Sequence, residues 1–434
     1  RGEVHLATIQ SSPFAAALVE VDSGLVAVER RIAGKSGTAT GPCASATSAA
    51  WYLPTGVTTI DARELLAVFN PFPDDAVADI AFVTSDGFRA PPDAQGLVLP
   101  ARHLSVLDVG KLAGRHDQVA TQVTARRGRV VVDRLQSFDG SATAHPASVA
   151  ATLGAPGAEP VWTFPQGSVG PDLAETFAIF NPGSETATVD LELTLDDPAT
   201  NGTADPIPVT VPPAGYALVV MADQARVPKG VAHSVVARVR AGPDVVPERV
   251  LIGTSAGQTG YGPALGSPLV ATTWLFADGS ADATTSARIT LFNPSPDSIA
   301  RVSVAELAQG HSADIDGLQR LEIAPGGRLE IDLGSRVERS ELTVTVTADR
   351  PIVAERGLFA ASGPGLSLAL GIPLPEGLQR APRAPAPTTT VVAPPPISDA
   401  SSGSTTTVPA TTTTSASTST TTTSTTTTST TVAP

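Results

Sequence analysis

Adjacent pairs of an acid and an arginine are the first candidates for a functional site in this sequence. Apolar stretches of the chain carry a carboxylate followed directly by an arginine at Glu29-Arg30, Asp133-Arg134, Glu248-Arg249 and Glu355-Arg356. Neighbouring side chains of a β-strand point to opposite faces, so the two members of a pair cannot bind each other. We expect one member to face solvent or a cross-strand partner. The arginine, with five donors, would brace a loop through backbone carbonyls; ligand binding by the arginines is the alternative.

A tryptophan recurs with the same period as these pairs. An exposed aromatic ring could serve as a platform for a sugar. The three tryptophans are spaced by about 110 residues, at Trp51, Trp162 and Trp274. Each has apolar neighbours, such as Leu275-Phe276 after the third. Because large aromatic side chains dominate core burial, we expect a structural role at the end of a domain or at a joint between domains. A sugar platform is the alternative.

The sequence holds none of the common catalytic or metal-binding patterns. Its six histidines show no His-Glu-x-x-His spacing, and no Gly-x-Ser-x-Gly elbow supports a serine hydrolase. The single cysteine, Cys43, excludes a disulfide framework within the chain and a cysteine zinc site; it is expected to be a free thiol or to form an intermolecular disulfide. We predict no catalytic residue, no metal ligand and no cofactor. A hydrolase with two carboxylates stays a distant third hypothesis, because such residues need only meet in space.

Acidic turns could hold calcium, which prefers several oxygen ligands. The candidates are Asp74-Asp75, Asp196-Asp197, and Asp278 with Asp282. They match no EF-hand spacing and fall at different places in the repeats described next. We therefore expect solvated turn carboxylates, with calcium binding as the alternative.

The elements that position these residues come in repeats of about 110 residues. Each tryptophan is followed by an identical Phe-Asn-Pro tripeptide, then by an acid–arginine pair and by Leu-Gly-x-Pro; the asparagines are Asn70, Asn181 and Asn293. This register predicts repeats at residues 51–158, 159–270 and 271–376. Residues 1–50 match only the closing part of a repeat, so we expect a partial fourth copy. Its exposed edges would be a weak point unless it packs on the next repeat.

Within a repeat the pattern is that of an antiparallel sandwich. Residues 341–347 alternate with period two, the mark of a strand with one buried face. Asp349-Arg350-Pro351 is expected to turn the chain, and residues 352–356 to return as the next strand. The asparagine of each Phe-Asn-Pro can close an Asx-type turn. Six or seven short strands in about 100 residues predict an all-β chain of tandem immunoglobulin-like β-sandwiches, with one short helical turn at residues 108–113.

The C-terminal region, residues 377–434, is rich in Thr, Ser and Pro. Such a segment cannot bury enough apolar surface to offset its ordering entropy, so we expect a disordered stalk, of the kind often O-glycosylated outside the cytoplasm. An unmodified linker is the alternative. The net charge of −14 argues against a nucleic-acid partner. No apolar run is long enough for a transmembrane segment. The chain starts at Arg1, as a mature form or an excised fragment would, and shows no signal peptide.

The order Trp-x-x-Pro/Ala-x-Gly, Phe-Asn-Pro and Val-x-Glu-Arg resembles tandem β-domain repeats of uncharacterised secreted or surface proteins of actinobacteria. The resemblance covers residues 1 to about 375 and departs at Asp133, where Glu would be usual. It implies an extracellular or cell-envelope location and no catalytic residues.

These observations favour a non-enzymatic structural or presentation protein, whose repeats form a rod on a flexible stalk. Its partner would be cell-wall polysaccharide or another surface protein. A module that binds cell-wall or host glycans is the alternative, and the divergent loops are where binding would evolve.

Overall fold

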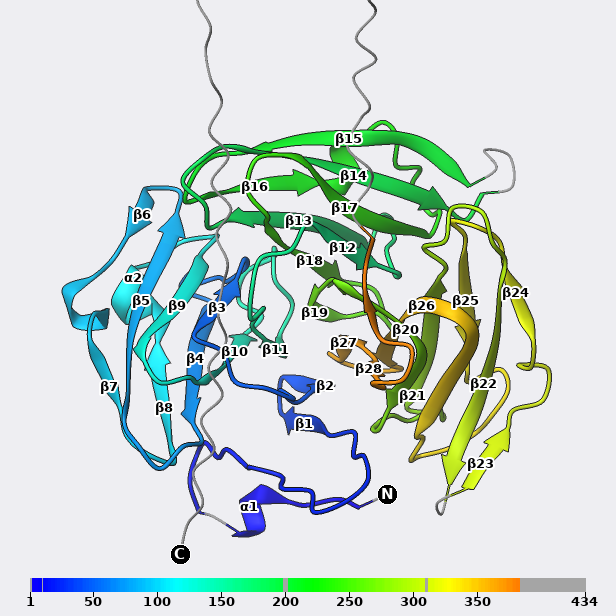
Figure 1. The fold of residues 1–434 in the computed structure, drawn as a ribbon, viewed down its shortest axis with the longest axis horizontal. Helices are drawn as coiled ribbons and strands as arrows, with labels where there is room; N and C mark the ends of the chain where they lie inside the picture. The colour runs from blue at the N-terminus through cyan, green and yellow to red at the C-terminus, as the bar shows by residue number, and fades with distance from the viewer. Residues whose placement is uncertain (1, 10, 198–201, 309–310, 383–434) are drawn as a thin grey trace, which may run out of the picture. The chain divides into compact units, whose positions relative to one another are not determined.

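The computed structural model describes residues 2–9, 11–197, 202–308 and 311–382, and these residues form an all-β structure (Figure 1). The predicted class, tandem antiparallel sandwiches of immunoglobulin type, is confirmed. Residues Arg1–Ala384 make one compact unit. The predicted disorder of the tail concerns residues that, from 383 onward, lie outside the described part.

The first repeat consists of two antiparallel sheets. We call "inner" the sheet that carries the acid–arginine strand, ordered β11-β10-β4-β8, and "outer" the sheet with the tryptophan strand, ordered β3-β9-β5-β6 with β7 beside β5. The elements are β3 (Ala50–Leu53), β4 (Ala62–Asn70), β5 (Ala76–Thr84), β6 (Gly87–Arg89), a 3-10 turn (Pro92–Ala94), β7 (Leu97–Leu99), β8 (His103–Asp108), α2 (Val109–Ala113), β9 (Ala120–Arg127), β10 (Val131–Phe138) and β11 (Ser148–Leu153). The helix α2 lies where the short helical turn was expected.

The second repeat has the same plan. Its inner sheet is β16-β13-β18-β19 and its outer sheet is β12-β17-β14-β15. The elements are β12 (Val161–Phe164), β13 (Leu173–Asn181), β14 (Ala187–Leu195), β15 (Thr203–Val211), β16 (Gly215–Val220), a 3-10 turn (Met221–Asp223), β17 (His233–Ala241), β18 (Val246–Gly253) and β19 (Gly260–Leu265).

The third repeat corrects one expectation. The predicted turn at Asp349-Arg350-Pro351 is wrong, because β26 runs through it without a break. The first part of β26 pairs with β20 and β22, and its last part pairs with β21 and β27, so one long strand passes from the outer to the inner sheet. The elements are β20 (Leu269–Phe276), β21 (Thr285–Phe292), β22 (Ala300–Ala308), β23 (His311–Asp314), β24 (Leu321–Ile323), β25 (Arg328–Asp332), β26 (Val344–Ala360), β27 (Leu366–Leu370), β28 (Ile372–Pro373) and β29 (Gln379–Arg380).

Residues 2–50, the partial module, contain a single hairpin. Strand β1 (Glu29–Gly34) pairs with β2 (Gly37–Pro42), and a helical turn, α1 (Leu6–Ile9), lies upstream. This hairpin corresponds to β10–β11, β18–β19 and the β26–β27 pair of the repeats. Each of these hairpins joins an acid–arginine strand to the strand that follows it in the chain.

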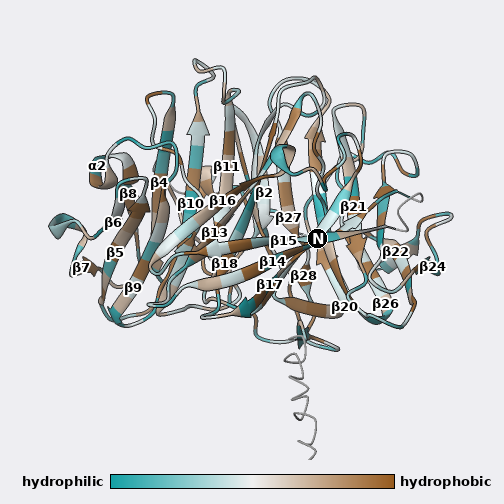
Figure 2. Ribbon diagram, turned by 90° about the horizontal axis from the view of Figure 1, so that it is seen from above, coloured by the Kyte–Doolittle hydropathy of each residue, from teal (hydrophilic) through white to brown (hydrophobic). Residues whose placement is uncertain are grey.

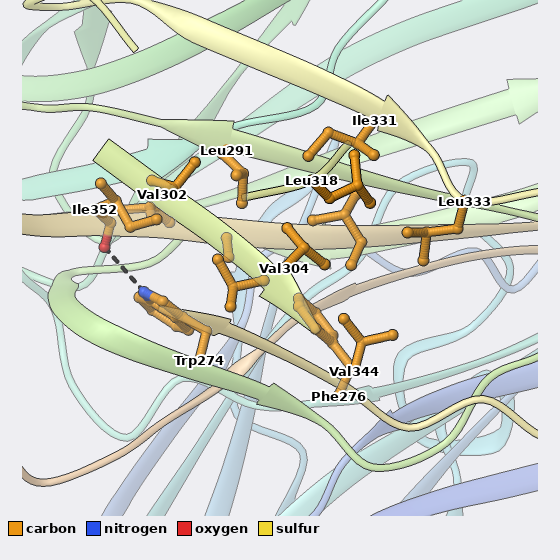
Figure 3. Close-up of a cluster of buried hydrophobic side chains, with 14 of the residues drawn as sticks. Trp274, Phe276, Leu291, Val302, Val304, Leu318, Ile331, Leu333, Val344 and Ile352 are labelled. Atoms are coloured by element: carbon orange, nitrogen blue, oxygen red, sulfur yellow. Dashed lines mark hydrogen bonds between the residues drawn. The ribbon is translucent and has the colours of Figure 1, made fainter. Parts of the chain in front are cut away.

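Each repeat encloses its own apolar core. Brown, hydrophobic stretches follow the strands in Figure 2, whereas much of the loops is teal or white. Trp274 lies in the third core, and its indole N–H donates to the Ile352 carbonyl at 3.0 Å (Figure 3). Trp51 and Trp162 make the same bond to Val130 and Val245, both at 2.9 Å. All three rings are buried, which argues against a sugar platform.

The asparagine of each Phe-Asn-Pro links its own turn to the segment that ends about 30 residues later in the chain. The Asn181 side-chain amide donates to the carbonyls of Glu185, Val211 and Pro212, at 2.7, 3.2 and 3.1 Å. Its Oδ1 accepts from the Gly183 N–H at 2.9 Å, which closes an Asx turn. Asn70 and Asn293 make the equivalent set of bonds, and all three asparagines are buried.

Replacing Asn181 with Ala should lower the free energy of unfolding by about 2–4 kcal/mol, because several buried backbone groups lose their partner together. Urea denaturation followed by tryptophan fluorescence measures this. Thr210→Ala, at an exposed position of β15, should change stability by no more than about 0.5 kcal/mol. Equal effects of the two changes would contradict the role given to the asparagine.

The last strands of the four hairpins meet one another. Strand β2 contacts β11, β11 contacts β19, β19 contacts β27, and β27 contacts β2; Figure 1 shows them drawn together between the sandwiches. The Thr40 N–H donates to Ser367 Oγ, and that hydroxyl donates to the Thr40 carbonyl, both at 2.9 Å. A rod would keep the partial module far from the third repeat, so the expected rod is wrong. The modules form a closed cycle of contacts.

Candidate functional site

The four acid–arginine pairs are the joints of this cycle. The arginine of each module pairs with the acid of the next one: Arg134 with Glu248 at 2.5 Å, Arg249 with Glu355 at 2.5 Å, Arg356 with Glu29 at 3.1 Å, and Arg30 with Asp133 at 2.7 Å. The third repeat thus binds the partial module, and the partial module binds the first repeat. The expectation that one member of each adjacent pair faces solvent or a cross-strand partner is wrong for Glu248-Arg249 and Glu355-Arg356, because both side chains of each pair are buried and bind neighbouring modules.

Each buried acid also receives a backbone N–H from the module that supplies the arginine. The donor is the residue four positions after the tryptophan. Thr55 donates to Glu248 at 3.0 Å, Gln166 to Glu355 at 3.0 Å, and Asp278 to Glu29 at 2.6 Å. A buried ion pair is tolerable only when its remaining hydrogen-bonding capacity is met. The loop after each tryptophan meets part of it.

The arginines also brace loops, as the sequence suggested. Arg134 donates to the Thr55 carbonyl, Arg356 to the Asp278 carbonyl, and Arg30 to the Pro42 carbonyl, the last at 2.7 Å. For Arg249 the Phe164 ring at the end of β12 lies beside the guanidinium instead, with its centroid 5.8 Å from the guanidinium carbon. The pairing between modules was missed by sequence reasoning, although the identical register of the pair in every module was a signal for it.

The fourth joint is less complete than the others. Its two side chains are 21% and 19% exposed, for Arg30 and Asp133. Asp133 is one methylene shorter than the glutamates at the other joints. The partial module has no described equivalent of the tryptophan loop. This joint is therefore a partly solvated ion pair, which we expect to contribute less than the fully buried joints, although burial still raises the pKa of Asp133.

A second carboxylate lies beside two of the joints, on the strand that pairs with the acid–arginine strand. In the second repeat it is Glu175, whose Oε2 lies 2.6 Å from His233 Nε2, with both side chains fully buried. No spacing in the sequence had linked His233 to a carboxylate. A carboxylate–imidazole dyad could move a proton, but solvent does not reach this one. The Glu175–His233 contact is therefore suited to stabilising the fold.

In the first repeat the equivalent carboxylate is Glu64, and neither of its oxygens has a hydrogen-bond partner among the described residues. Burial raises the pKa of Glu64 to about 8, partly offset by the positive charge of Arg134 and reinforced by the negative charge of Glu248. A Cβ on Gly56 would lie 2.4 Å from Glu64 Oε2, so the carboxyl fills the space that this glycine leaves.

One hollow of about 220 Å³ lies between the second and third repeats. Polar side chains such as Gln258 and Asp172 line it together with Phe359. The guanidinium of Arg288 lies 5.2 Å from the centre of the Phe359 ring and occupies one of its faces. Ligand pockets usually enclose about 300–1,000 Å³, so this hollow is small.

The acidic turns form hydrogen bonds and ion pairs within the fold. Asp75 accepts the Ala101 N–H, Asp196 pairs with Arg328, and Asp282 accepts the N–H of Thr284. Across the described ranges, no group of three or more His, Cys, Asp or Glu side chains is arranged to hold a metal ion. No helix in that part of the chain is both long and apolar enough to cross a membrane.

Part of the chain is similar to a family without an assigned activity. Residues 23–152 match a family of unknown function (DUF5719), from the turn before β1 to the last strand of the first repeat. No curated protein matches the chain. A solved structure from Thermotoga maritima, titled "Crystal Structure of Thermotoga maritima 1070", is similar at 19% identity over 25% of this chain and 94% of that chain, with a TM-score of 0.22.

Proposed function

We propose that the protein is a non-enzymatic structural or presentation protein of the cell envelope or the extracellular space. The observation that carries the proposal is the use of the charged residues. The acids and arginines that could do chemistry are buried in the joints between modules, where they hold the cycle of contacts together. The loops at the ends of the sandwiches are left to present a surface.

The location rests on the sequence. The Thr/Ser/Pro-rich region after residue 376 is typical of stalks outside the cytoplasm, and the order of repeat motifs resembles actinobacterial surface proteins. Cell-wall polysaccharide or another surface protein is the partner class that this proposal implies.

Binding of cell-wall or host glycans is the second candidate, and one observation favours it. Phe72 and Phe88 of the first repeat are 41% and 55% exposed. Exposed rings on loops and edge strands can stack on a sugar, whereas the three tryptophans are buried and cannot. The small hollow beside Phe359 is a weaker site, because Arg288 already covers that ring.

Co-sedimentation with isolated actinobacterial cell walls tests both candidates. Sedimentation of the full chain that persists after truncation at Ala384 would place wall recognition on the sandwiches. Loss of sedimentation on truncation would place it on the tail. We expect the Phe72→Ser/Phe88→Ser variant to sediment like the unchanged protein if the chain is a spacer. At least a tenfold loss of bound protein would favour the glycan-binding candidate instead.

A further inference from the structure

The hollow between the second and third repeats lies where apolar side chains fill the equivalent space one joint earlier. Between the first and second repeats that space holds a buried apolar cluster, which includes Val57, Phe138 and Val250. The register of each repeat, counted from its tryptophan or its acid, gives the corresponding residues one repeat later. They are Ser168, Gly253 and Gly357. Loss of these apolar side chains accounts for the open space at the second joint.

Both repeats supply polar side chains to this hollow. The connection from β12 to β13, residues 166–173, forms one wall, and the turn between β18 and β19 adds Ser255 and Gln258. From the third repeat, β21 contributes Arg288 and β25 contributes Glu330. The hollow is therefore a polar site built by two modules.

The side chain of Gln166 provides an unused hydrogen-bond acceptor in this wall. Gln166 is 7% exposed, and its Oε1 has no hydrogen-bond partner among the described residues. Its backbone N–H already binds Glu355 at the joint, at 3.0 Å. Gly357 makes room for Oε1, because a Cβ there would lie 2.8 Å from that oxygen. Buried polar atoms are almost always hydrogen-bonded, so a donor group of a ligand fits this position.

A second unpartnered acceptor lies next to the same wall. Glu175 Oε1 has no hydrogen-bond partner among the described residues, although Oε2 contacts His233. A Cβ on Gly167, which lines the hollow, would lie 2.8 Å from Glu175 Oε1. Unpartnered acceptors thus occur at two consecutive positions of the wall, at Gln166 itself and beside Gly167.

Arg288 provides hydrogen-bond donors on the other side of the hollow. Its guanidinium packs on the Phe359 ring, and its ion-pair partner Glu330 is 3.7 Å away, too far for a hydrogen bond. The Arg288 side chain is 36% exposed. Its N–H groups are therefore available to an oxygen atom of a ligand. Because Arg288 covers the ring, such a ligand is held by polar contacts and not by stacking.

The charges around the hollow favour a neutral ligand that carries hydroxyl groups. An anion would meet the carboxylates of Asp172 and Glu330, and a cation would meet Arg288. A hydroxyl group can donate to Gln166 Oε1, and another can accept from Arg288. The volume of about 220 Å³ suits one sugar ring and is too small for a longer saccharide.

We propose that this hollow binds a single neutral sugar unit. One hydroxyl donates to Gln166 Oε1, another accepts from the Arg288 guanidinium, and the side chains of Leu173 and Leu251 contact the C–H groups of the ring. The site goes beyond the spacer role proposed above. It is also separate from the exposed phenylalanines, which lie in the first repeat.

Ligand-observed saturation-transfer NMR on the full chain tests the proposal, with glucose, galactose, mannose and N-acetylglucosamine as probes. We expect at least one of these sugars to bind saturably with a Kd on the order of 1 mM. Gln166→Leu keeps the side-chain volume but removes the acceptor, and Ser168→Val restores the residue type of the filled joint. Each change should weaken binding by about tenfold or more. The Phe72→Ser/Phe88→Ser variant should bind like the unchanged protein.

Absence of saturable binding by all four sugars would overturn the proposal. Binding that Gln166→Leu and Ser168→Val leave unchanged would also overturn it, and its loss in Phe72→Ser/Phe88→Ser would assign the sugar to the exposed rings. Tighter binding of glucosamine or glucuronate than of glucose would overturn the neutral class of ligand. Each of these results leaves the wall-sedimentation test standing, because free monosaccharides are the only probes here.

Discussion

Replacing Arg249 with Met should lower the free energy of unfolding by about 3–5 kcal/mol, because Glu355 would be left buried without its cation. Both side chains are inaccessible to solvent, and the pair lies between two repeats. The Gln166 N–H would remain as a donor to the carboxylate. One backbone donor does not replace a bidentate guanidinium. Urea denaturation at pH 7 measures the change.

The double variant Arg249→Met/Glu355→Met distinguishes the cost of an orphaned charge from the value of the pair. Apolar residues of similar volume often replace a buried ion pair without loss of stability. The double variant should therefore recover most of the stability that the single variant loses. A double variant as unstable as the single one would show that the joint depends on the ionic bond itself.

Arg30→Met is the matched control at the partly exposed joint. Its loss should be smaller, about 1–2 kcal/mol, because the Asp133 side chain is 19% exposed and can be partly hydrated once Arg30 is gone. A loss there as large as that of Arg249→Met would contradict the distinction between the buried joints and the fourth joint.

The sandwich fold could be predicted from the sequence because its recurring motifs meet structural requirements within one turn or one core. The Asn in Phe-Asn-Pro is the residue that closes an Asx turn, and a large aromatic ring such as Trp51 needs a core. Such requirements act over a few residues or within one repeat. They recur wherever the same strand and turn recur, so three copies in register identify the module and its length.

The joints could not be derived in the same way. Arg134 and Glu248 are far apart in the chain, and the same repeats would serve a rod or a closed cycle. The choice depends on the angle between successive modules, which the packing of β2, β11, β19 and β27 decides. The unbroken course of β26 was not predicted from the sequence for a related reason. Asp349-Arg350-Pro351 has turn chemistry, yet pairing with both sheets keeps the strand extended.

The protonation state of Glu64 also could not be predicted from the sequence. Glu64 and Glu175 occupy equivalent positions, and only the spatial neighbours separate them. His233 supplies a partner to Glu175. At Glu64 the neighbouring groups include Gly56 and the Arg134–Glu248 pair, and burial is the main cause that raises the pKa of the carboxyl.

Replacing Glu64 with Gln should stabilise the protein relative to the unchanged chain, and this difference in the free energy of unfolding should grow as the pH rises. The folded pKa of Glu64 is raised to about 8 from an ordinary value of 4.5. Below pH 4.5 the carboxyl is neutral in both states and costs nothing. Between pH 4.5 and 8 the unfolded chain releases the proton while the folded protein holds it, so stability falls by up to about 1.4 kcal/mol per pH unit and levels off above pH 8.

The amide side chain that this substitution introduces stays neutral at every pH. Relative to the unchanged protein, Glu64→Gln should therefore be similar in stability near pH 4.5 and more stable by up to about 4 kcal/mol at pH 8. Urea denaturation at pH 5 to 9 measures the difference. Glu175→Gln at the equivalent position disrupts a bond to His233 and should be destabilising instead. Parallel pH profiles for Glu64→Gln and the unchanged protein would show that Glu64 is ionised in the fold, with a partner for its charge.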